Sequence, residues 1–452
     1  MVYLDFSATS PLLPEVRDAM LQVMNLSVSG DLGNPSSLHS PGSLGRDLLQ
    51  TARVAVASLV DASPEELIFT SGGSESNNTV LHTFEGCPVF ASAIEHHSVL
   101  TPATEYGRPF VEIPVDRQGI VDLAFLEREL TRLLKKRPYE KILVSVMVAN
   151  NETGVIEPIR ELSALIKRLN KTSSAHIFLH ADATQAVGKI PVSVNSLGVD
   201  YLTFSAHKLG GPIGIGALYV RSGSPFRPLI FGGAQESHRR AGTSNAVLAE
   251  GFRLAAQHAS VSLKHYDRIR ELRDYLCIEI QKRIKTAKIV TPGLLEPSFE
   301  AAKENPRIFR GDYERARSMA GATRSASRSA RLIDEKNPTG FSLARKNGSN
   351  KLILPNVLSV SFPAAEGESI QLYLDLEGFA VSTGSACASG DITPSHVLMA
   401  MFGDAEVAHN SVRFSLGLDT KKSDLDKLLT VLPPIISRLQ GLSTIKSNQE
   451  QP

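Results

Sequence analysis

The chain has 452 residues, of which 42% are hydrophobic and 21% are charged, so it is long enough to bury a large core in two domains. Its 48 Lys and Arg residues balance 47 Asp and Glu residues, which leaves no overall field favouring nucleic acid or an anionic membrane as the main partner. The longest apolar runs, such as residues 142–149, are strand-sized and fall short of the roughly 20 residues that a membrane helix requires.

The opening residues, MVYLDFSATSPLLPEV, lack the basic start, apolar core and small-residue cleavage site of a secretory signal. The three cysteines, Cys87, Cys277 and Cys387, include no C-x-x-C pair, which argues against a disulfide framework or a cysteine zinc site. We therefore expect a cytoplasmic protein without a metal centre.

Short β-rich runs alternate with helical patterns between about residues 66 and 221. The expected strands are residues 66–70, 89–94, 142–149, 176–182, 200–205 and 215–220. Continuous apolar strands separated by amphipathic helices are typical of a mainly parallel sheet covered by helices on both faces, so the sequence predicts an α/β fold. Ligands of such sheets collect at the carboxyl ends of the strands, where this chain is unusually polar.

The second half of the chain begins with an amphipathic helix at residues 265–285. Its apolar stripe consists of Ile269, Leu272, Leu276, Ile280 and Ile284. Cys277 lies beside this stripe, so we expect a buried hydrophobic residue rather than a reactive thiol. Short strand patterns at 288–293 and 356–362 follow, which predicts a second, smaller α+β domain.

Residues 294–352 carry an excess of Arg and Lys, many Ser and Ala, and few large hydrophobic residues. Such a segment cannot bury enough apolar surface to offset its ordering entropy, so we expect an inserted, largely disordered loop. Its charge could dock an acidic partner or RNA, but a solvated linker is the favoured interpretation. The predicted parts are a large domain at 15–257, a small domain at 1–14 and 258–440, the insertion at 294–352, and a flexible tail at 441–452.

Small and polar residues follow the first two predicted strands. The run SGGS at residues 71–74 leads directly into a helix, so backbone N–H groups and the positive end of the helix dipole meet there and could hold a phosphate. A turn of this kind is also a common helix cap, so the motif alone is weak. His96 and His97 follow the second strand, where a histidine is more often a satisfied polar residue than a catalyst.

Polar residues also follow the next three strands. Asn151 suits a turn and can also hold a ligand oxygen. Asp182 ends the fourth strand with Gln185 one turn on, and a helix cap and a functional role are equally good interpretations of this Asp. Lys208 follows the fifth strand, and a lysine between two buried strands is a candidate amine for a Schiff base.

These strand-end residues are more specific as a set than alone. A phosphate cradle, a flat ring at His96, a carboxylate at Asp182 and an amine at Lys208 are all predicted at one edge of one sheet. Pyridoxal 5'-phosphate requires these four functions, including a carboxylate that keeps its ring nitrogen protonated so that the ring accepts electrons. We therefore predict that Lys208 carries this cofactor as a Schiff base.

A series of longer motifs runs through nearly the whole chain. In order they are YLDFSATSPLLPEV, GNPSSLHSPG, FTSGGSESNN, EHHSVL, NNETGV, HADATQAVGK, SAHK, GGAQESHRRAGTSN, STGSACASG and SVRFSLG. Together they resemble the cysteine desulfurases, fold type I pyridoxal-phosphate enzymes of the class V aminotransferase group. The resemblance omits only residues 294–352 and the tail, and it implies a large domain with a mainly parallel seven-stranded sheet plus a smaller α+β domain.

The resemblance implies a role for each matching residue. Lys208 matches the lysine that binds the cofactor, and His96 matches the histidine that stacks on its ring and moves protons. Asp182 and Gln185 match the partners of the ring nitrogen and the ring oxygen. The implied phosphate contacts are Gly73, Ser74, Ser205, His207 and, from the other subunit of a homodimer, Thr243. The implied contacts to the substrate carboxylate and to ring-side groups are Asn34, Asn151 and Arg413, of which Asn151 also serves the cofactor.

Cys387 lies among small residues, which predicts an exposed loop rather than a packed core. The resemblance implies that its thiolate attacks the sulfur of L-cysteine, that alanine leaves, and that a persulfide remains on Cys387. The sulfur would then pass to an acceptor such as an iron–sulfur scaffold or a sulfur carrier; an inert surface thiol is the alternative. Ser74 stands where the family commonly has Thr, and Ala206 where it commonly has Gly.

Other functions of the same fold remain open. A selenocysteine lyase uses the same cofactor site and does not need attack by a cysteine, so it is the nearest alternative. A transaminase, another sulfur lyase of the class V group, or a scaffold that binds partners through the basic insertion are further alternatives. Membrane and nucleic-acid partners are not expected.

Overall fold

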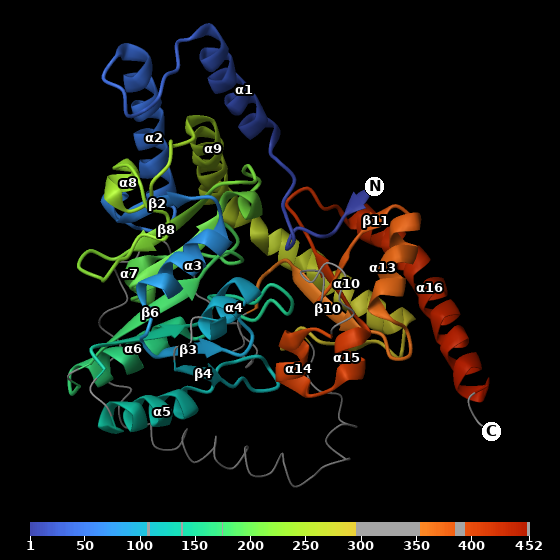
Figure 1. Ribbon diagram of the computed structural model, residues 1–452. Coiled ribbons are helices and arrows are strands. Elements are labelled where there is room, and N and C mark those ends of the chain that lie inside the picture. The colour runs from blue at the N-terminus through green and yellow to red at the C-terminus, as the bar shows by residue number, and fades with distance from the viewer. Residues whose placement is uncertain (106–108, 137–138, 174, 295–352, 385–393, 450–452) are drawn as a thin grey trace, which may run out of the picture. The chain divides into compact units, whose positions relative to one another are not determined.

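The computed structural model describes residues 1–449 apart from 106–108, 137–138, 174, 295–352 and 385–393. Among the residues described, the largest sheet has seven strands in the order β2-β8-β7-β6-β5-β3-β4 (Figure 1). They are β2 (Leu67–Thr70), β3 (Val89–Ser92), β4 (Phe110–Ile113), β5 (Lys141–Ser145), β6 (His176–Asp182), β7 (Tyr201–Ser205) and β8 (Gly216–Val220). Strand β8 is antiparallel to both neighbours and the other pairs are parallel, so the predicted α/β fold with a mainly parallel seven-stranded sheet is confirmed.

Helices cover both faces of this sheet because alternate strand residues point to opposite sides. In β3, Phe90 packs in the cluster that includes helices α2, α5, α6 and α9, whereas Val89 and Ala91 pack in the cluster with α3 and α4. The helices of this domain are α1 (Pro14–Ser29), α2 (Ser40–Ser58), α3 (Gly73–Thr83), α4 (His97–Glu105), α5 (Leu123–Lys136), α6 (Ile159–Asn170), α7 (Val194–Leu197), α8 (Gln235–His238) and α9 (Ala246–Ser262).

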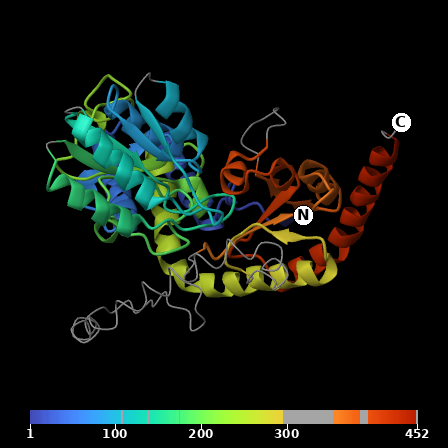
Figure 2. The same cartoon turned by 90° about the horizontal axis from the view of Figure 1, so that it is seen from below.

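A smaller antiparallel sheet forms the second domain, with strand order β12-β13-β10-β9. Its strands are β9 (Lys288–Ile289), β10 (Val357–Ser361), β12 (Ser382–Thr383) and β13 (Ser411–Ser415). The parallel pair β1 (Val2–Tyr3) and β11 (Phe379–Ala380) forms a separate two-stranded sheet. The helices of the second domain are α10 (Tyr266–Arg283), α13 (Gly367–Leu376), α14 (His396–Phe402), α15 (Ala405–His409) and α16 (Lys422–Gln449). Figure 2 shows α10, in yellow, running from the large domain along the small one.

Helix α10 follows the predicted apolar stripe with one exception. Ile269, Leu276 and Ile280 are fully buried, and Cys277 is 2% exposed as expected for a packed hydrophobic residue. Leu272 is only half-buried, and the adjacent Arg273 is buried completely. The guanidinium of Arg273 donates to the Leu354 carbonyl at 2.6 Å, which supplies a polar partner inside the domain.

The predicted insertion, the cysteine segment and the predicted tail fall wholly or partly outside the described residues. The basic insertion, apart from residue 294, and the whole of residues 385–393 with Cys387 belong to the ranges that the structure does not describe. Helix α16 continues to Gln449, so the backbone of the predicted tail is helical through most of its length. Within the described ranges, no helix is both long enough and apolar enough for a membrane crossing.

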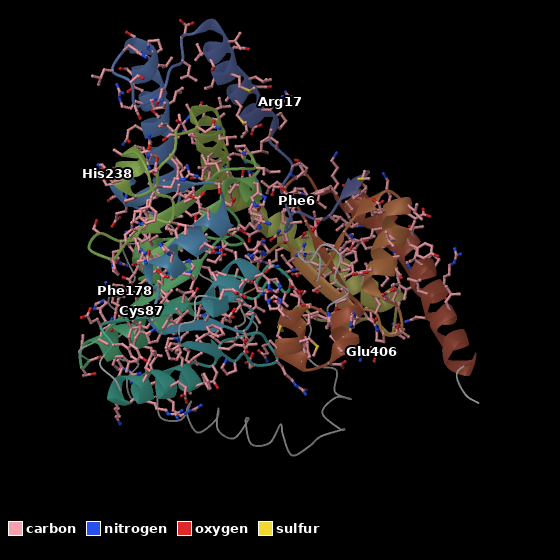
Figure 3. All side chains as sticks on the ribbon, viewed as in Figure 1. Phe6, Arg17, Cys87, Phe178, His238 and Glu406 are labelled. Carbon is pink, nitrogen blue, oxygen red and sulfur yellow. The ribbon has the colours of Figure 1, made fainter. Side chains whose placement is uncertain are left out.

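The N-terminal segment passes between the two domains before entering α1. Figure 3 shows Phe6 on this segment, and its ring packs against the backbone of Gly417, where a Cβ would leave no room. The backbone N–H of Ser10 donates to the His207 carbonyl at 2.9 Å, and that of Leu13 donates to the Gly210 carbonyl at 2.9 Å. These bonds tie the segment to the turn that carries Lys208.

A buried ion pair holds an unusual turn beside the sheet. Glu236, Ser237 and His238 have φ angles of 48°, 57° and 63°, a left-handed conformation that costs roughly 1–2 kcal/mol for each residue other than glycine. The Glu236 carboxylate makes two 2.7 Å bonds to Arg53 and accepts the Phe69 N–H at 3.0 Å. This carboxylate therefore anchors the turn to α2 and β2.

We expect Glu236→Gln to lower the free energy of unfolding by about 3 kcal/mol, because it leaves the Arg53 guanidinium buried without its charged partner. Urea denaturation at fixed protein concentration measures the change. Glu127→Gln breaks the exposed Arg168 pair and serves as the control, with an expected change below about 1 kcal/mol. Equal effects of the two substitutions would contradict the anchoring role of Glu236.

Candidate active site

Three predicted site residues meet at the carboxyl edge of the large sheet. Asp182 is the last residue of β6, Lys208 lies in the turn Ala206–Leu209 after β7, and His96 follows β3. Burial lowers the pKa of His96, while Asp182 raises it and Lys208 lowers it. Both charges therefore act on this ring, although the three residues come from three different strands.

Asp182 is a buried carboxylate with fixed partners. It is 6% exposed, its Oδ2 accepts the Asn77 side chain at 2.7 Å, and its Oδ1 accepts the Thr184 N–H at 2.8 Å. His180 lies two residues before it, and burial lowers the pKa of that histidine to about 4. A neutral His180 cannot form an ion pair with Asp182, so the negative charge stays available at the sheet edge.

The carbonyl of Ser7 joins two candidate residues. The Lys208 ammonium donates to it at 2.6 Å and also reaches the Ala8 carbonyl, while the Gln185 side chain donates to it at 2.9 Å. Ser7 comes from the N-terminal segment, which no strand-end argument places here. The segment therefore positions the amine and the amide next to each other.

The proton of neutral His96 can be assigned from its contacts. The Ser98 backbone N–H donates to His96 Nδ1 at 3.1 Å, so Nδ1 must be an acceptor and the ring proton lies on Nε2. His97 stacks near His396, with ring centroids 4.5 Å apart, and His396 Nε2 contacts the Glu95 carbonyl at 2.9 Å. These contacts bring the start of α14 next to the histidine pair.

Arg413 of β13 brings a cation from the small domain. Its Nη2 pairs with the Asp5 carboxylate at 2.8 Å, and its Nη1 donates to the Asn151 carbonyl at 3.1 Å. The side chain is nearly buried, and its Nε has no hydrogen-bond partner among the described residues. A guanidinium with one unused buried donor suits a carboxylate ligand.

The predicted anion cradle has room at its glycines. Gly72 has a φ of 158°, which favours glycine, and a Cβ added at Gly73 would come 3.2 Å from Thr184 Oγ1. Thr184 Oγ1 and Ser7 Oγ are buried without a hydrogen-bond partner among the described residues. The unused Thr184 hydroxyl beside the N-terminus of α3 fits a ligand with many acceptor oxygens.

Two further phosphate candidates flank Lys208. Ser205 ends β7, and its hydroxyl donates weakly to the Ile215 carbonyl at 3.4 Å. His207 Nδ1 contacts the Thr9 hydroxyl at 3.1 Å, and burial together with Lys208 lowers the pKa of His207 to about 4. His207 is therefore neutral at pH 7, and its contribution is a hydrogen bond rather than a charge.

The comparisons with known proteins give one consistent result. The model of the class-V aminotransferase family matches residues 2–296 and 339–428. A cysteine desulfurase IscS of Dictyoglomus turgidum is 39% identical over 98% of this chain and 97% of its own length. The chain belongs to the cysteine desulfurase family of the class-V aminotransferases. Cysteine desulfurase IscS 1 of Archaeoglobus fulgidus is 35% identical over 98% of this chain and 99% of its own.

Solved structures of NifS-like proteins share this cysteine desulfurase fold. One is 31% identical, with a TM-score of 0.74 over 97% of this chain and 99% of the other. The NifS-like protein from Rickettsia africae is 28% identical, with a TM-score of 0.75 over 97% of this chain and 99% of its own. The similarity therefore extends through both domains.

Two of the residues that the cysteine desulfurase motifs single out make no described contact with this cluster. Asn34 is exposed in the loop before α2, where its side chain accepts the Ser36 N–H at 2.9 Å. Thr243 is exposed in the segment after α8. None of the contacts described for the chain joins either residue to Lys208 or Asp182.

Cys387 is not among the described residues, but both flanks of its segment are. Gly384 and Ser395 pack against Glu152: a Cβ on Gly384 would collide with this carboxylate, and Ser395 Oγ donates to it at 2.5 Å. Burial raises the pKa of Glu152 from 4.5 to about 7. A single buried carboxyl group therefore contacts the chain at both ends of the cysteine segment.

Several cysteine desulfurase site residues were missed by sequence reasoning. Asp5, Ser7, Asn77 and Thr184 all lie within the matching motifs, but no period or spacing distinguishes them from their neighbours. Their signal is chemical: each contacts, or lies beside, a residue that the motifs did identify.

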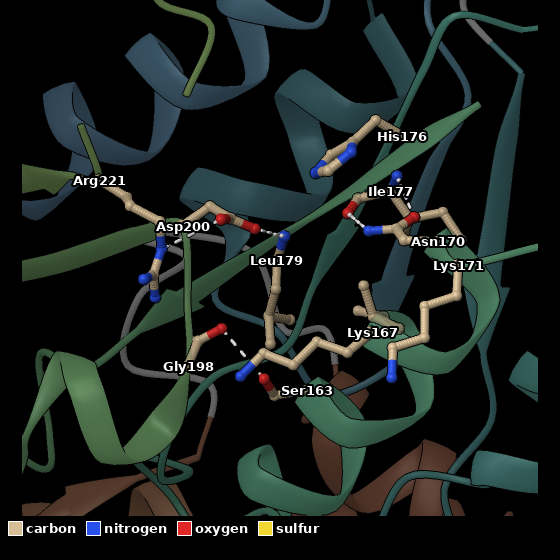
Figure 4. Close-up of a pocket in the computed structure, with 11 residues that line it drawn as sticks. Ser163, Lys167, Asn170, Lys171, His176, Ile177, Leu179, Gly198, Asp200 and Arg221 are labelled. Carbon is tan, nitrogen blue, oxygen red and sulfur yellow. Dashed lines mark hydrogen bonds and ion pairs between the residues drawn. The ribbon is translucent and has the colours of Figure 1, made fainter. Parts of the chain in front are cut away.

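A pocket of about 470 Å³ lies elsewhere in the large domain and is not this site (Figure 4). It is lined by His176, which begins β6, and by Lys167, Lys171, Asp200 and Arg221. It therefore lies at the amino ends of the parallel strands, opposite the edge where Asp182 and Lys208 meet. Helix α6 ends beside it, and basic residues near a helix C-terminus need no ligand to explain them.

We expect the stability advantage of the parent over Glu152→Gln to fall as the pH rises from 5 to 8. The folded chain keeps the Glu152 proton up to about pH 7, whereas the unfolded chain loses it near 4.5, so the free energy of unfolding falls by up to about 3 kcal/mol across this window. Urea unfolding of both proteins at four pH values measures the difference. A difference that does not vary with pH would rule out this titration.

Proposed function

We propose that the chain is a cysteine desulfurase that holds pyridoxal 5'-phosphate at Lys208 and moves the sulfur of L-cysteine to Cys387. The observation that carries this proposal is the meeting of Lys208, His96 and Asp182 at one sheet edge in a chain whose relatives are named cysteine desulfurases. Arg413 adds a partner for the carboxylate of an amino-acid substrate.

The residues present fit this cofactor. The unused Thr184 and Ser7 hydroxyls and the open glycines at the start of α3 suit its phosphate, together with Ser74, Ser205 and His207. The buried Asp182 carboxylate suits a protonated ring nitrogen, and the Gln185 amide suits an acceptor oxygen on the ring. Lys208 supplies the amine, which donates hydrogen bonds to two carbonyls of the N-terminal segment in this structure.

Pyridoxal phosphate, when bound, supplies an electron sink for bonds broken beside the substrate's α-carbon. Lys208 holds the cofactor through Nζ and can then carry a proton on that same atom. His96 holds a proton on Nε2, because its Nδ1 is occupied by the Ser98 N–H. Asp182 accepts hydrogen bonds from Asn77 and from the Thr184 N–H, and its carboxylate would favour the protonated form of the group it faces.

Arg413 binds and orients the substrate carboxylate, with its Nη1 held by Asn151 and its Nε unused. The thiolate of Cys387 attacks the substrate sulfur, so a sulfur–sulfur bond forms while the substrate's carbon–sulfur bond breaks. The carbon takes up a proton and leaves as alanine, and Cys387 retains the sulfur as a persulfide. No external oxidant is needed, because the substrate sulfur is transferred at the expense of its own carbon bond.

The proposal includes partners and a setting. Thr243 is exposed and has no described contact with the cluster, which is compatible with a residue that serves the site of a second subunit, so we propose a homodimer. A protein acceptor, such as an iron–sulfur scaffold or a sulfur carrier, would collect the persulfide sulfur. A thiol-dependent reaction requires a reducing compartment, which favours the cytoplasm.

We expect Lys208→Ala to lose the visible absorbance of the bound cofactor and to reduce turnover of L-cysteine on the order of a thousandfold or more. Absorbance spectroscopy and alanine release measure the two effects. Lys264→Ala, at an exposed lysine of the small domain, should leave both unchanged. Full turnover by the Lys208 variant would refute the assignment of the amine.

We expect mass spectrometry to find one added sulfur on the peptide that contains Cys387 after incubation with L-cysteine. Cys387→Ala should abolish sulfide release, whereas Cys87→Ala should retain it. Survival of most activity in the Cys387 variant, with selenocysteine as the better substrate, would favour a selenocysteine lyase. A keto acid in place of alanine would favour a transaminase.

A further inference from the structure

A second buried amine, Lys189, lies beside the site and has no role in the steps above. Its side chain is 3% exposed, and it follows Gln185 by four residues in the turn after β6. Its Nζ donates to Gln185 Oε1 at 2.9 Å. Burial, together with the charges of Lys208 and Arg413, lowers the pKa of Lys189 to about 7.

This contact determines which way the Gln185 amide faces. A side-chain amide can present either its oxygen or its NH2 group in a given direction. Lys189 Nζ carries N–H donors in both its charged and its neutral form, and it donates one of them to the Gln185 oxygen, so it favours that oxygen on its side. The Ser7 carbonyl can only accept, and it receives the Gln185 NH2 group at 2.9 Å on the other side. Both neighbours therefore fix the same orientation.

The Ser7 and Lys189 contacts to Gln185 differ in how they depend on Lys208. The Ser7 carbonyl is shared, because it also accepts from the Lys208 ammonium at 2.6 Å, and that second bond is lost when Lys208 binds the cofactor. The Lys189 contact does not involve Lys208, so it persists when a ligand occupies the sheet edge. An apolar side chain would fill the position of Lys189 at lower desolvation cost, so the amine is suited to holding its polar neighbour.

We infer that Lys189 is a positioning residue that holds the Gln185 amide with its N–H facing the ring oxygen of the cofactor. The inference rests on the proposed function. A donated hydrogen bond stabilises the anionic form of that oxygen, and it thereby lowers the pH at which the chromophore loses its own proton. Without Lys189 only the Ser7 carbonyl holds the amide, so the amide turns more readily and then presents its oxygen, which repels the anionic ring oxygen.

Lys189→Met tests this role, because Met fills a similar volume without a donor. We expect the pH midpoint of the visible absorbance change to rise by roughly one unit, a tenfold change in the equilibrium. We also expect cofactor affinity to fall on the order of fivefold, as for the loss of one hydrogen bond. Lys167→Met, at the exposed lysine of the Figure 4 pocket, is the matched control and should change neither value.

A double-mutant cycle separates positioning from a direct effect of charge. If Lys189 acts through the amide, Lys189→Met should add no further shift in a Gln185→Ala background. An equal shift in both backgrounds would overturn the inference, and so would an unchanged midpoint in the single variant. Lys189→Leu, which also lacks a donor, is expected to shift the midpoint like Met and serves if the Met variant does not fold.

The parent spectrum distinguishes this inference from the proposed function. A parent chain that gains no visible absorbance with pyridoxal phosphate refutes the proposed function, and the inference fails with it. A parent chain with normal absorbance and an unshifted Lys189 variant refutes only the inference.

Discussion

The parallel arrangement of β3, β5, β6 and β7 is the constraint on which the site depends. Parallel strands end at the same edge of a sheet, so residues that follow different strands reach one place. Strands β6 and β7 pair with Asp182 opposite Thr203, which places the Lys208 turn directly after the neighbouring strand. Because helices pack on both faces, a strand cannot slide along its neighbour without disturbing the core. The sheet therefore fixes the spacing of the reactive groups before a ligand binds.

The charges at this edge are those of a site for an anionic ligand. Lys208 and Arg413 both lower the pKa of Lys189, so these three basic side chains lie within electrostatic range of one another. Asp5 pairs with only one of them, and Asp182 is engaged by neutral donors. An anion that binds among the cations relieves their repulsion, and a phosphate or an amino-acid carboxylate would do so. Without such a ligand, backbone carbonyls of the N-terminal segment accept the Lys208 ammonium.

The strand ends could be predicted from the sequence, whereas the long-range contacts could not. Apolar runs reveal a buried strand by their composition, and the edge site follows from topology. Strand β4 was missed because only one of its four residues is fully buried and its hydrophobic pattern is weak. Asp5 and Arg413 are 408 residues apart, and Glu236 and Arg53 are 183 apart, so no local period connects either pair. The left-handed turn at Glu236 contains no glycine that could have indicated it.

The position of the N-terminal segment constrains the order in which the protein can assemble. Its first strand pairs with β11, and the Ser7 N–H donates to the Ser415 hydroxyl at 2.9 Å. Residues 2–7 therefore find their partners among residues that leave the ribosome several hundred residues later. Contacts of such high sequence separation close late because the intervening loop must first lose its entropy. The large sheet can form during synthesis, but the site becomes complete only when almost the entire polypeptide has emerged.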